Sequence, residues 1–469
     1  MSVDTNPIVS YYQCPAELVR WEAAEPVGNA SGFFRFGSSA IAYGSCSATS
    51  VSKCAFSGLD DALLKTTVTN GTVRLPFNLT DVIDNLRLER YVDAPDGMKS
   101  LTTILLKDAY YFFRPFTPSF VRCGFQRMYY RGWEKIAFPQ WPVDFSVDRT
   151  FQSVMALLLR DDPHKSIPFI WFWPMGLSCC SIMTHDVEGE EGRKFCDNMM
   201  DIDDSFGIKS SFQIVPEQRY QVTPELLARF RGRGFEINVH DLNHDGQLFR
   251  NENTFLSRAK KINHYAQEFG AVGFRSGAMY RRPEWIKALQ VSYDMSVPNV
   301  AHMEPQRGGC CTVMPYFIDG IVELPLTTTQ DWALHNVLRQ NDIELWKREI
   351  ELISTQHGLI SFIVHPDYTL APQAQQAYRE LLVHLAELRS KNKVWTPLPR
   401  DLNEWWRQRT QMHIVERRGK WVIEGAGKER ARIAYARLRE GELVYDLEAP
   451  TGTPAECLTG NGVANRSEA

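Results

Sequence analysis

The sequence has few cysteines, no long apolar run and no block of like charge. Its 469 residues include ten cysteines, too few for a disulfide framework, so we expect reduced thiols. The most apolar stretch, residues 167–183, is shorter than the roughly 20 residues of a membrane helix and contains two prolines, Pro168 and Pro174, so we expect no membrane span. The N-terminus shows no basic segment followed by an apolar one, so we expect no secretory signal and a cytoplasmic location.

The distribution of charge argues against nucleic acids and lipids as partners. The 52 basic and 56 acidic residues give a net charge of −4 without long blocks of one sign. A nucleic-acid-binding or lipid-binding surface needs a basic patch, so we expect neither partner. Hydrophobic residues make up 44% of the chain, which is typical of a globular protein, and 469 residues exceed the size of one hydrophobic core.

The order of apolar and turn-forming segments predicts four regions. Residues 1–145 mix short apolar runs with turn residues, which indicates an α+β or β-rich accessory domain. Residues 146–410 alternate short strands with helical segments, which indicates parallel β/α architecture, either a barrel or an open sheet. Residues 411–449 read as strands joined by glycine turns, a small β appendage, and residues 450–469 as a polar tail.

Polar side chains stand at the ends of several predicted strands. Asp186 and Glu188 end one strand, His240 a second, Arg275 a third and His365 a later one. The carboxyl ends of parallel strands in a β/α barrel meet at one rim, where such barrels place their active sites. We therefore expect these residues to lie together. His185 points to the opposite face of its strand, and we interpret it as structural.

The stretch HDLNHDGQLFRNE carries two metal signatures. Its acidic and amide residues follow the spacing of a calcium loop: Asp241, Asn243, Asp245 and Glu252. That loop must follow a helix, and the segment before it reads as a strand, so we interpret these residues as turn-forming. The second signature is the HxxxH pair, His240 and His244, whose spacing lets two imidazoles face one ion.

A carboxylate from a neighbouring strand would complete a two-histidine, one-carboxylate set. In a strand, Asp186 and Glu188 point the same way, so one can bind the metal while the other stands beside the metal-bound water. The same set of ligands also serves iron, which keeps a non-haem iron oxygenase open as an alternative.

The motifs together resemble a known family. THDVE, HDLNH, GFRSG, SYDMSV and IVH follow one another over residues 179–400, and their order is similar to the polysaccharide deacetylase family of metal-dependent carbohydrate esterases, which includes chitooligosaccharide deacetylases. The resemblance implies a distorted (β/α) barrel of about seven strands and one divalent metal ion, usually zinc. It also implies hydrolysis of N-acetyl groups on sugars, and some relatives hydrolyse other amides such as cyclic ureides.

Carried over by position, the resemblance assigns six residues. Asp186 is the catalytic base, Arg275 holds that base, and His365 is the general acid; the metal ligands are Glu188, His240 and His244. Asp331 and Trp332 correspond to a segment that lines the pocket. Three positions depart from the family pattern: the adjacent acidic pair is absent, Asp241 replaces a serine, and Gly277 and Ala278 replace Pro-Tyr.

We therefore expect a hydrolase that removes an N-acyl group, in particular N-acetyl, from an amino sugar or polysaccharide intermediate. A carbohydrate or another N-acylated molecule would be its substrate. The alternatives are a small-molecule amidase resembling the allantoinase-like branch and a non-catalytic glycan-binding relative. An iron oxygenase would have no need for the pairing of Asp186 with Arg275. The oligomeric state is left open.

Overall fold

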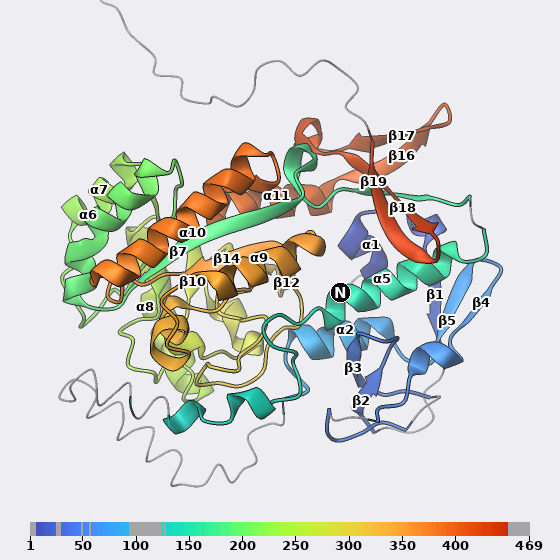
Figure 1. Cartoon of the computed structure of the whole chain (residues 1–469), viewed down its shortest axis with the longest axis horizontal. Coiled ribbons are helices and arrows are strands. Elements are labelled where there is room, and N and C mark those ends of the chain that lie inside the picture. The colour runs from blue at the N-terminus through green and yellow to red at the C-terminus, as the bar shows by residue number, and fades with distance from the viewer. Residues whose placement is uncertain are drawn as a thin grey trace, which may run out of the picture.

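The structure is a computed structural model, and Figure 1 shows how its helices and strands are arranged. It describes residues 6–24, 30–47, 50–55, 58–92, 124, 128–162 and 164–448. The predicted polar tail and the aromatic-rich stretch 108–120 lie outside these ranges. Within them, no helix has the length and apolar character needed to cross a membrane. The eight cysteines in these ranges are all free thiols.

A largely parallel sheet forms the centre of residues 179–395. Its strands run in the order β12-β13-β11-β10-β9-β8-β7-β14, with β15 also paired to β7. The bounds are β7 (Cys179–Val187), β8 (Ser211–Ile214), β9 (Glu236–His240), β10 (Gly273–Arg275), β11 (Tyr293–Asp294), β12 (Tyr316–Ile318), β13 (Ile321–Glu323), β14 (Leu359–Ile363) and β15 (Val394–Trp395). Only β12 pairs antiparallel among these strands. The predicted distorted (β/α) barrel of about seven strands is confirmed.

Helices cover the outer face of this sheet. They are α6 (Glu190–Ser205), α7 (Pro224–Gly232), α8 (Glu252–Glu268), α9 (Glu344–Thr355), α10 (Pro372–Ser390) and α11 (Pro399–Gln411), with short helical turns η6 (Gly277–Met279), η7 (Pro283–Ala288) and η8 (Ala333–Val337). Thr223 caps α7 by accepting the backbone N–H of Leu226 at 3.2 Å, and Pro224 occupies the first turn, as the sequence predicts. The apolar sides of α6 to α10 share a buried cluster with Phe212, Ile237 and Phe274 of the strands, whereas Trp405 of α11 belongs to a separate cluster.

The gap between β13 and β14 is bridged by side chains. Thr327 donates its hydroxyl to the Leu359 carbonyl at 2.7 Å and accepts the backbone N–H of Ser361 at 2.9 Å. Thr328 donates to the Ser361 carbonyl at 2.7 Å. Side-chain hydroxyls here make the hydrogen bonds that backbone groups make between an ordinary pair of strands. This is one physical reason that the barrel is distorted. We call Thr327, Thr328 and their two partners on β14 the threonine seam.

The N-terminal region is a mixture of short strands and helices. Its elements are α1 (Pro7–Tyr12), η1 (Ala16–Leu18), β1 (Arg20–Ala23), β2 (Gly32–Arg35), β3 (Ile41–Gly44), η2 (Ala62–Lys65), β4 (Thr67–Thr69), β5 (Thr72–Leu75), α2 (Leu79–Arg87) and η4 (Trp133–Lys135). The strands form a three-stranded sheet, β1-β5-β4, and the hairpin β2-β3. The predicted α+β accessory region is confirmed.

The C-terminal β appendage is also confirmed, and it pairs with an earlier segment. It consists of β16 (His413–Arg417), β17 (Lys420–Glu424), η9 (Lys428–Arg430), β18 (Ile433–Arg439) and β19 (Glu442–Leu447). The linking segment carries α5 (Ser146–Leu159), β6 (Ile167–Ile170) and η5 (Pro174–Gly176). β18 pairs antiparallel with β6, with Ile433 opposite Ile170. The apolar run around β6 is therefore buried strand and loop.

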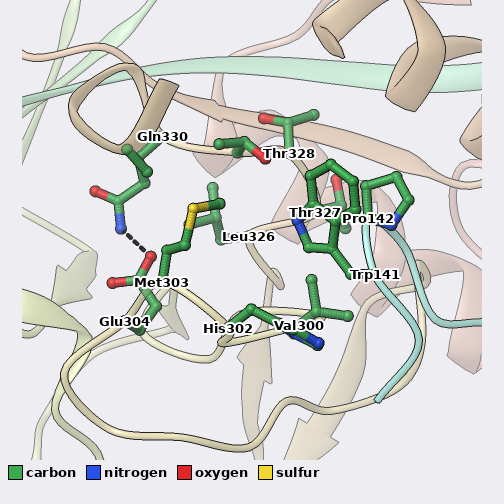
Figure 2. Close-up of a pocket in the computed structure, with 12 residues that line it drawn as sticks. Trp141, Pro142, Val300, His302, Met303, Glu304, Leu326, Thr327, Thr328 and Gln330 are labelled. Carbon is green, nitrogen blue, oxygen red and sulfur yellow. Dashed lines mark hydrogen bonds between the residues drawn. The ribbon is translucent and has the colours of Figure 1, made fainter. Parts of the chain in front are cut away.

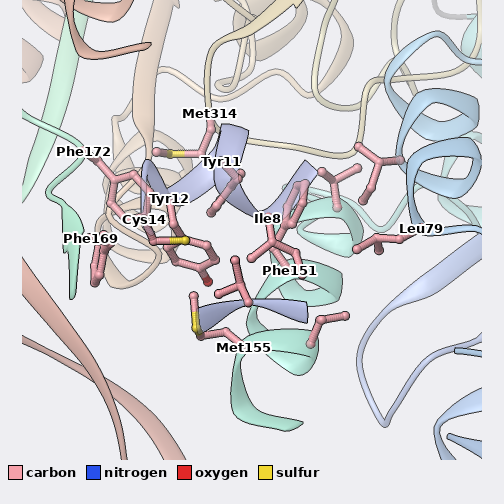
Figure 3. Close-up of a cluster of buried hydrophobic side chains, with 14 of the residues drawn as sticks. Ile8, Tyr11, Tyr12, Cys14, Leu79, Phe151, Met155, Phe169, Phe172 and Met314 are labelled. Carbon is pink, nitrogen blue, oxygen red and sulfur yellow. The ribbon is translucent and has the colours of Figure 1, made fainter. Parts of the chain in front are cut away.

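One hydrophobic cluster draws on both ends of the chain. Figure 3 shows Tyr12, Phe151 and Phe169 among the side chains of this cluster, and the same cluster includes Trp405 and Ala434. Helix α5 and strand β6 thus pack with the N-terminal region as well as preceding the barrel. The predicted boundaries after residues 145, 410 and 449 stay a prediction.

Candidate metal centre

The carboxyl ends of strands of the same parallel sheet bring the predicted site residues together. Asp186 lies near the end of β7, His240 ends β9 and Arg275 ends β10, opposite His240 in the register. Glu188 follows β7 and His365 follows β14. The chain then turns sharply after β9, so that His244, with a φ of 52°, faces back toward this rim.

Glu188, His240 and His244 form a set that could hold a metal ion. One ligand atom from each lies within 4.8 Å of the other two. His244 Nε2 is 2.9 Å from Glu188 Oε1, yet within the described residues this nitrogen has no partner that meets hydrogen-bond geometry. This carboxylate oxygen and this imidazole nitrogen are close enough to bind one shared cation.

The protonation of His240 fits the same role. Its Nδ1 lies 3.1 Å from the Arg275 carbonyl oxygen and donates to it, which leaves a lone pair on Nε2 facing the site. That buried Nε2 is unpartnered among the described residues. Burial lowers the pKa of His240 to about 4, because the charged ring is poorly solvated there. The neutral imidazole, the form that binds metals, is therefore favoured.

Asp186 is held as an ionised carboxylate. Burial, the largest single influence, would raise its pKa, but Arg275, His240 and His365 together outweigh burial and the pKa is lowered. Arg275 Nη1 donates to Asp186 Oδ1 at 2.8 Å and to the Thr184 hydroxyl at 2.7 Å. The other carboxylate oxygen of Asp186 is 3.7 Å from His240 Nε2. A negative proton acceptor thus lies directly beside the candidate metal set.

The pKa of His365 is shifted in the opposite direction, upward. Burial opposes its charge, but Asp331 accepts from His365 Nδ1 at 2.6 Å and raises the pKa of the ring to about 10. Asp331 also accepts the His365 backbone N–H at 2.8 Å. His365 Nε2 is 3.8 Å from Glu188 Oε1, so the ring's second nitrogen faces the site. Asp331, which we expected to line the pocket, holds this histidine, while Trp332 packs on Tyr130.

The calcium interpretation of the same loop finds no support. Arg258 binds both carboxylate oxygens of Asp245 at 2.7 Å, which neutralises a ligand that a calcium loop needs. Asp241 accepts the backbone N–H of Leu242 and shapes the turn. A strand, β9, precedes the loop where a helix would be required.

His185 lies away from the metal set, on the other face of β7. Its Nε2 is 3.1 Å from Asp203, and its Nδ1 is 2.7 Å from the Val364 carbonyl oxygen. Both nitrogens are satisfied inside a buried cluster that includes Tyr378. This placement is that of a core histidine.

A small pocket lined by both polar and apolar side chains lies near the centre, and Figure 2 shows the residues that line it. Gln330, next to Asp331 in the chain, donates to Glu304 at 2.7 Å. Burial raises the pKa of Glu304 to about 7, and charges on His365 and Asp186 act on it as well. We did not predict Glu304 from the sequence, because it lies in an irregular loop where no spacing distinguishes it. Trp141, which precedes α5, forms part of the opposite wall of this pocket.

Comparisons with known proteins give similarities of fold only. No protein-family model matches the chain, and no curated protein matches its sequence. A putative polysaccharide deacetylase from Mycobacterium smegmatis is 18% identical, with a TM-score of 0.41 over 54% of this chain and 98% of its own. An allantoinase is 13% identical, with a TM-score of 0.43 over 50% and 92%. A CE4 family pseudoenzyme from Bacillus anthracis is 11% identical, with a TM-score of 0.32 over 48% and 65%. Likenesses this weak carry no information on activity.

Proposed function

We propose that the protein is a metal-dependent hydrolase that removes an N-acyl group, in particular N-acetyl, from an amino sugar or polysaccharide intermediate. One observation carries this proposal. A carboxylate with a lowered pKa, Asp186, and an imidazole with a raised pKa, His365, lie beside the same cation-binding set. Opposite shifts of this kind separate a general base from a general acid.

The cation would be held by Glu188, His240 and His244. Two imidazole nitrogens and one carboxylate suit zinc among the divalent metals, and we propose zinc. When bound, such an ion supplies Lewis-acid activation of water and of the acyl oxygen. The protein's own residues must then move the protons.

Each proton transfer has a suitable residue. Asp186, kept ionised by Arg275, accepts the proton of the attacking water. His365, kept protonated by Asp331, donates a proton from Nε2 to the leaving amine, because an amine anion is too basic to depart. A non-catalytic glycan-binding protein would have no need to keep this base and this acid in opposite protonation states. The geometry therefore favours catalysis.

A small-molecule amidase of the allantoinase-like type is the second candidate. The same base, acid and metal set would hydrolyse a ureide. The buried Glu304–Gln330 pair beside the centre favours a small substrate rich in hydrogen-bonding groups. The products separate the two candidates, since an N-acetylated sugar releases acetate and a cyclic ureide releases none.

The test combines metal analysis with product assays. Wild-type protein should hold about one divalent ion per chain, and His244→Ala should hold far less, whereas His264→Ala on the exposed side of α8 should match wild type. Asp186→Asn should retain metal and lose on the order of 10²–10⁴ in kcat, a range typical of a missing general base. Wild-type protein that binds no divalent ion in vitro would sink the proposal.

A further inference from the structure

The loop after β14 reaches back to the junction of β7 and α6 through Asp367. One oxygen of its carboxylate accepts the backbone N–H of Glu188 at 3.0 Å and that of Gly189 at 3.3 Å. The other oxygen accepts the backbone N–H of Gly192 at 3.2 Å. Asp367 therefore caps the start of α6 from a distant part of the chain, and it does so at the candidate metal ligand itself.

Two glycines make this close approach possible. A Cβ at Gly192 would lie 2.0 Å from an Asp367 oxygen, and a Cβ at Gly189 would lie 2.7 Å from the other. Any side chain at either position would displace the Asp367 carboxylate. Glycine at these positions is therefore explained by contact with Asp367, since Gly192 lies within a helix, where alanine is otherwise favoured.

The same loop carries the proposed acid. His365 and Asp367 are separated by one residue, and Thr369 donates its hydroxyl to the His365 carbonyl at 2.8 Å, which tightens the turn. The bond from Asp367 to the Glu188 backbone thus ties the loop of the acid to the loop of the metal carboxylate. The tie acts on the backbone of Glu188, the residue whose side chain belongs to the candidate metal set.

We propose that Asp367 is a positioning residue that sets the affinity of the centre for its cation by fixing the backbone of Glu188. The inference rests on the proposed function, because it presupposes the Glu188–His240–His244 cation site. Asp367 acts through Glu188, as partners of metal ligands commonly do. An asparagine at this position would turn an NH₂ group toward one of the backbone N–H donors, so it could serve only one side of the cap.

The experiment measures cation binding by metal-free full-length protein. Co²⁺ is titrated into wild type, Asp367→Asn and Gly192→Ala, and the dissociation constant and the visible absorption of the bound ion are recorded. We expect both variants to bind Co²⁺ about 10–100-fold more weakly, with an altered absorption band. Gly192→Ala leaves the charge of Asp367 in place, so it tests position separately from charge.

Asn251→Ala is the matched control. Asn251 caps α8 by accepting the backbone N–H of Thr254 at 2.9 Å, far along the chain from Glu188. Its loss should lower the melting temperature, as loss of a helix cap does, without changing Co²⁺ affinity. If Asp367→Asn and Gly192→Ala are folded and bind Co²⁺ as wild type does, the inference is wrong and the proposed function stands. If wild type itself binds no Co²⁺ or Zn²⁺, the proposed function fails first.

Discussion

Asp186 and His365 show how buried partners decide a protonation state. Both side chains are almost fully buried, and burial alone would favour the neutral form of each. Arg275 keeps Asp186 charged, and Asp331 keeps His365 charged, each through a hydrogen bond shorter than 3 Å. The two charges that the proposed chemistry needs are therefore set by these partners, and Asp186 and His365 also stabilise each other's charge.

The pH response of His365 follows from its pairing with Asp331. In metal-free protein, the pKa of His365 should lie far above the ordinary 6.5, near 10. The pair therefore stabilises the fold fully below about pH 6.5 and loses this contribution as the pH rises through about 10. Asp331→Asn should lower the pKa of His365, because the strongest influence that raises it is lost while burial still lowers it. Histidine NMR titration measures both values.

His357 serves as the internal control for that titration. Its Nδ1 faces only the Ser178 carbonyl, and burial lowers its pKa. Asp331→Asn should leave the titration of His357 unchanged. A His365 that titrates near its ordinary value in wild-type protein would contradict the assignment of Asp331 as its counter-charge.

Some residues of the site could be predicted from the sequence, and others could not. Asp186, Glu188, His240, Arg275 and His365 were found because reactive side chains ended successive strands, and the structure gathers them at one rim. Their catalytic roles stay a prediction. The parts played by Asp331 and Asp367 were not foreseen, because each depends on how one loop folds against another. The short HPD sequence, residues 365–367, was the available signal for Asp367.

At the scale of elements, the threonine seam is the feature that sequence patterns miss. Apolar alternation predicted strands and helices through residues 179–390, and the longer elements are present. The strands β10, β11 and β15 have only two or three residues, too few to show a period. The sequence around Thr327 and Thr328 gives no sign that their hydroxyls form hydrogen bonds with the backbone of β14.

The seam predicts a specific loss of stability. Thr327→Val keeps the shape of the side chain but leaves the Leu359 carbonyl and the Ser361 N–H buried without their present partner. We expect the free energy of unfolding to fall by about 1–3 kcal/mol, measured by urea denaturation. Thr355→Val, the same change at an exposed end of α9, should have little effect. Equal effects of the two substitutions would contradict a structural role for the seam.

At the scale of the whole molecule, a buried ion pair joins the N-terminal region to the site. Arg281 Nε donates to Glu89 Oε2 at 2.6 Å, and its Nη2 bonds to the other oxygen. Arg281 Nη1 also donates to the Met279 carbonyl at 2.8 Å, in the turn that follows Arg275. The ion pair thus connects the segment after α2 to a loop of the metal centre, although Glu89 and Arg281 are 192 positions apart in the sequence.

Breaking this pair should be costly. Arg281→Met would leave the Glu89 carboxylate buried without its guanidinium, and we expect a loss of about 3–5 kcal/mol in the free energy of unfolding. The double variant Glu89→Leu with Arg281→Met should recover part of that loss, because no unpaired charge remains. Lys347→Met removes the cation of the exposed Lys347–Glu344 pair and should change stability by less than about 1 kcal/mol. If Arg281→Met lowers the free energy of unfolding by no more than Lys347→Met does, the stabilising role of the Arg281–Glu89 pair is wrong.

The cluster that unites the two ends of the chain also affects synthesis. Tyr12 and Phe34 share their core with Trp405 and Ala434, which leave the ribosome several hundred residues later. The N-terminal region therefore cannot bury its apolar side chains completely until almost the entire chain has emerged. We therefore expect this chain to depend on chaperones during synthesis more than a chain whose N-terminal domain completes its core early.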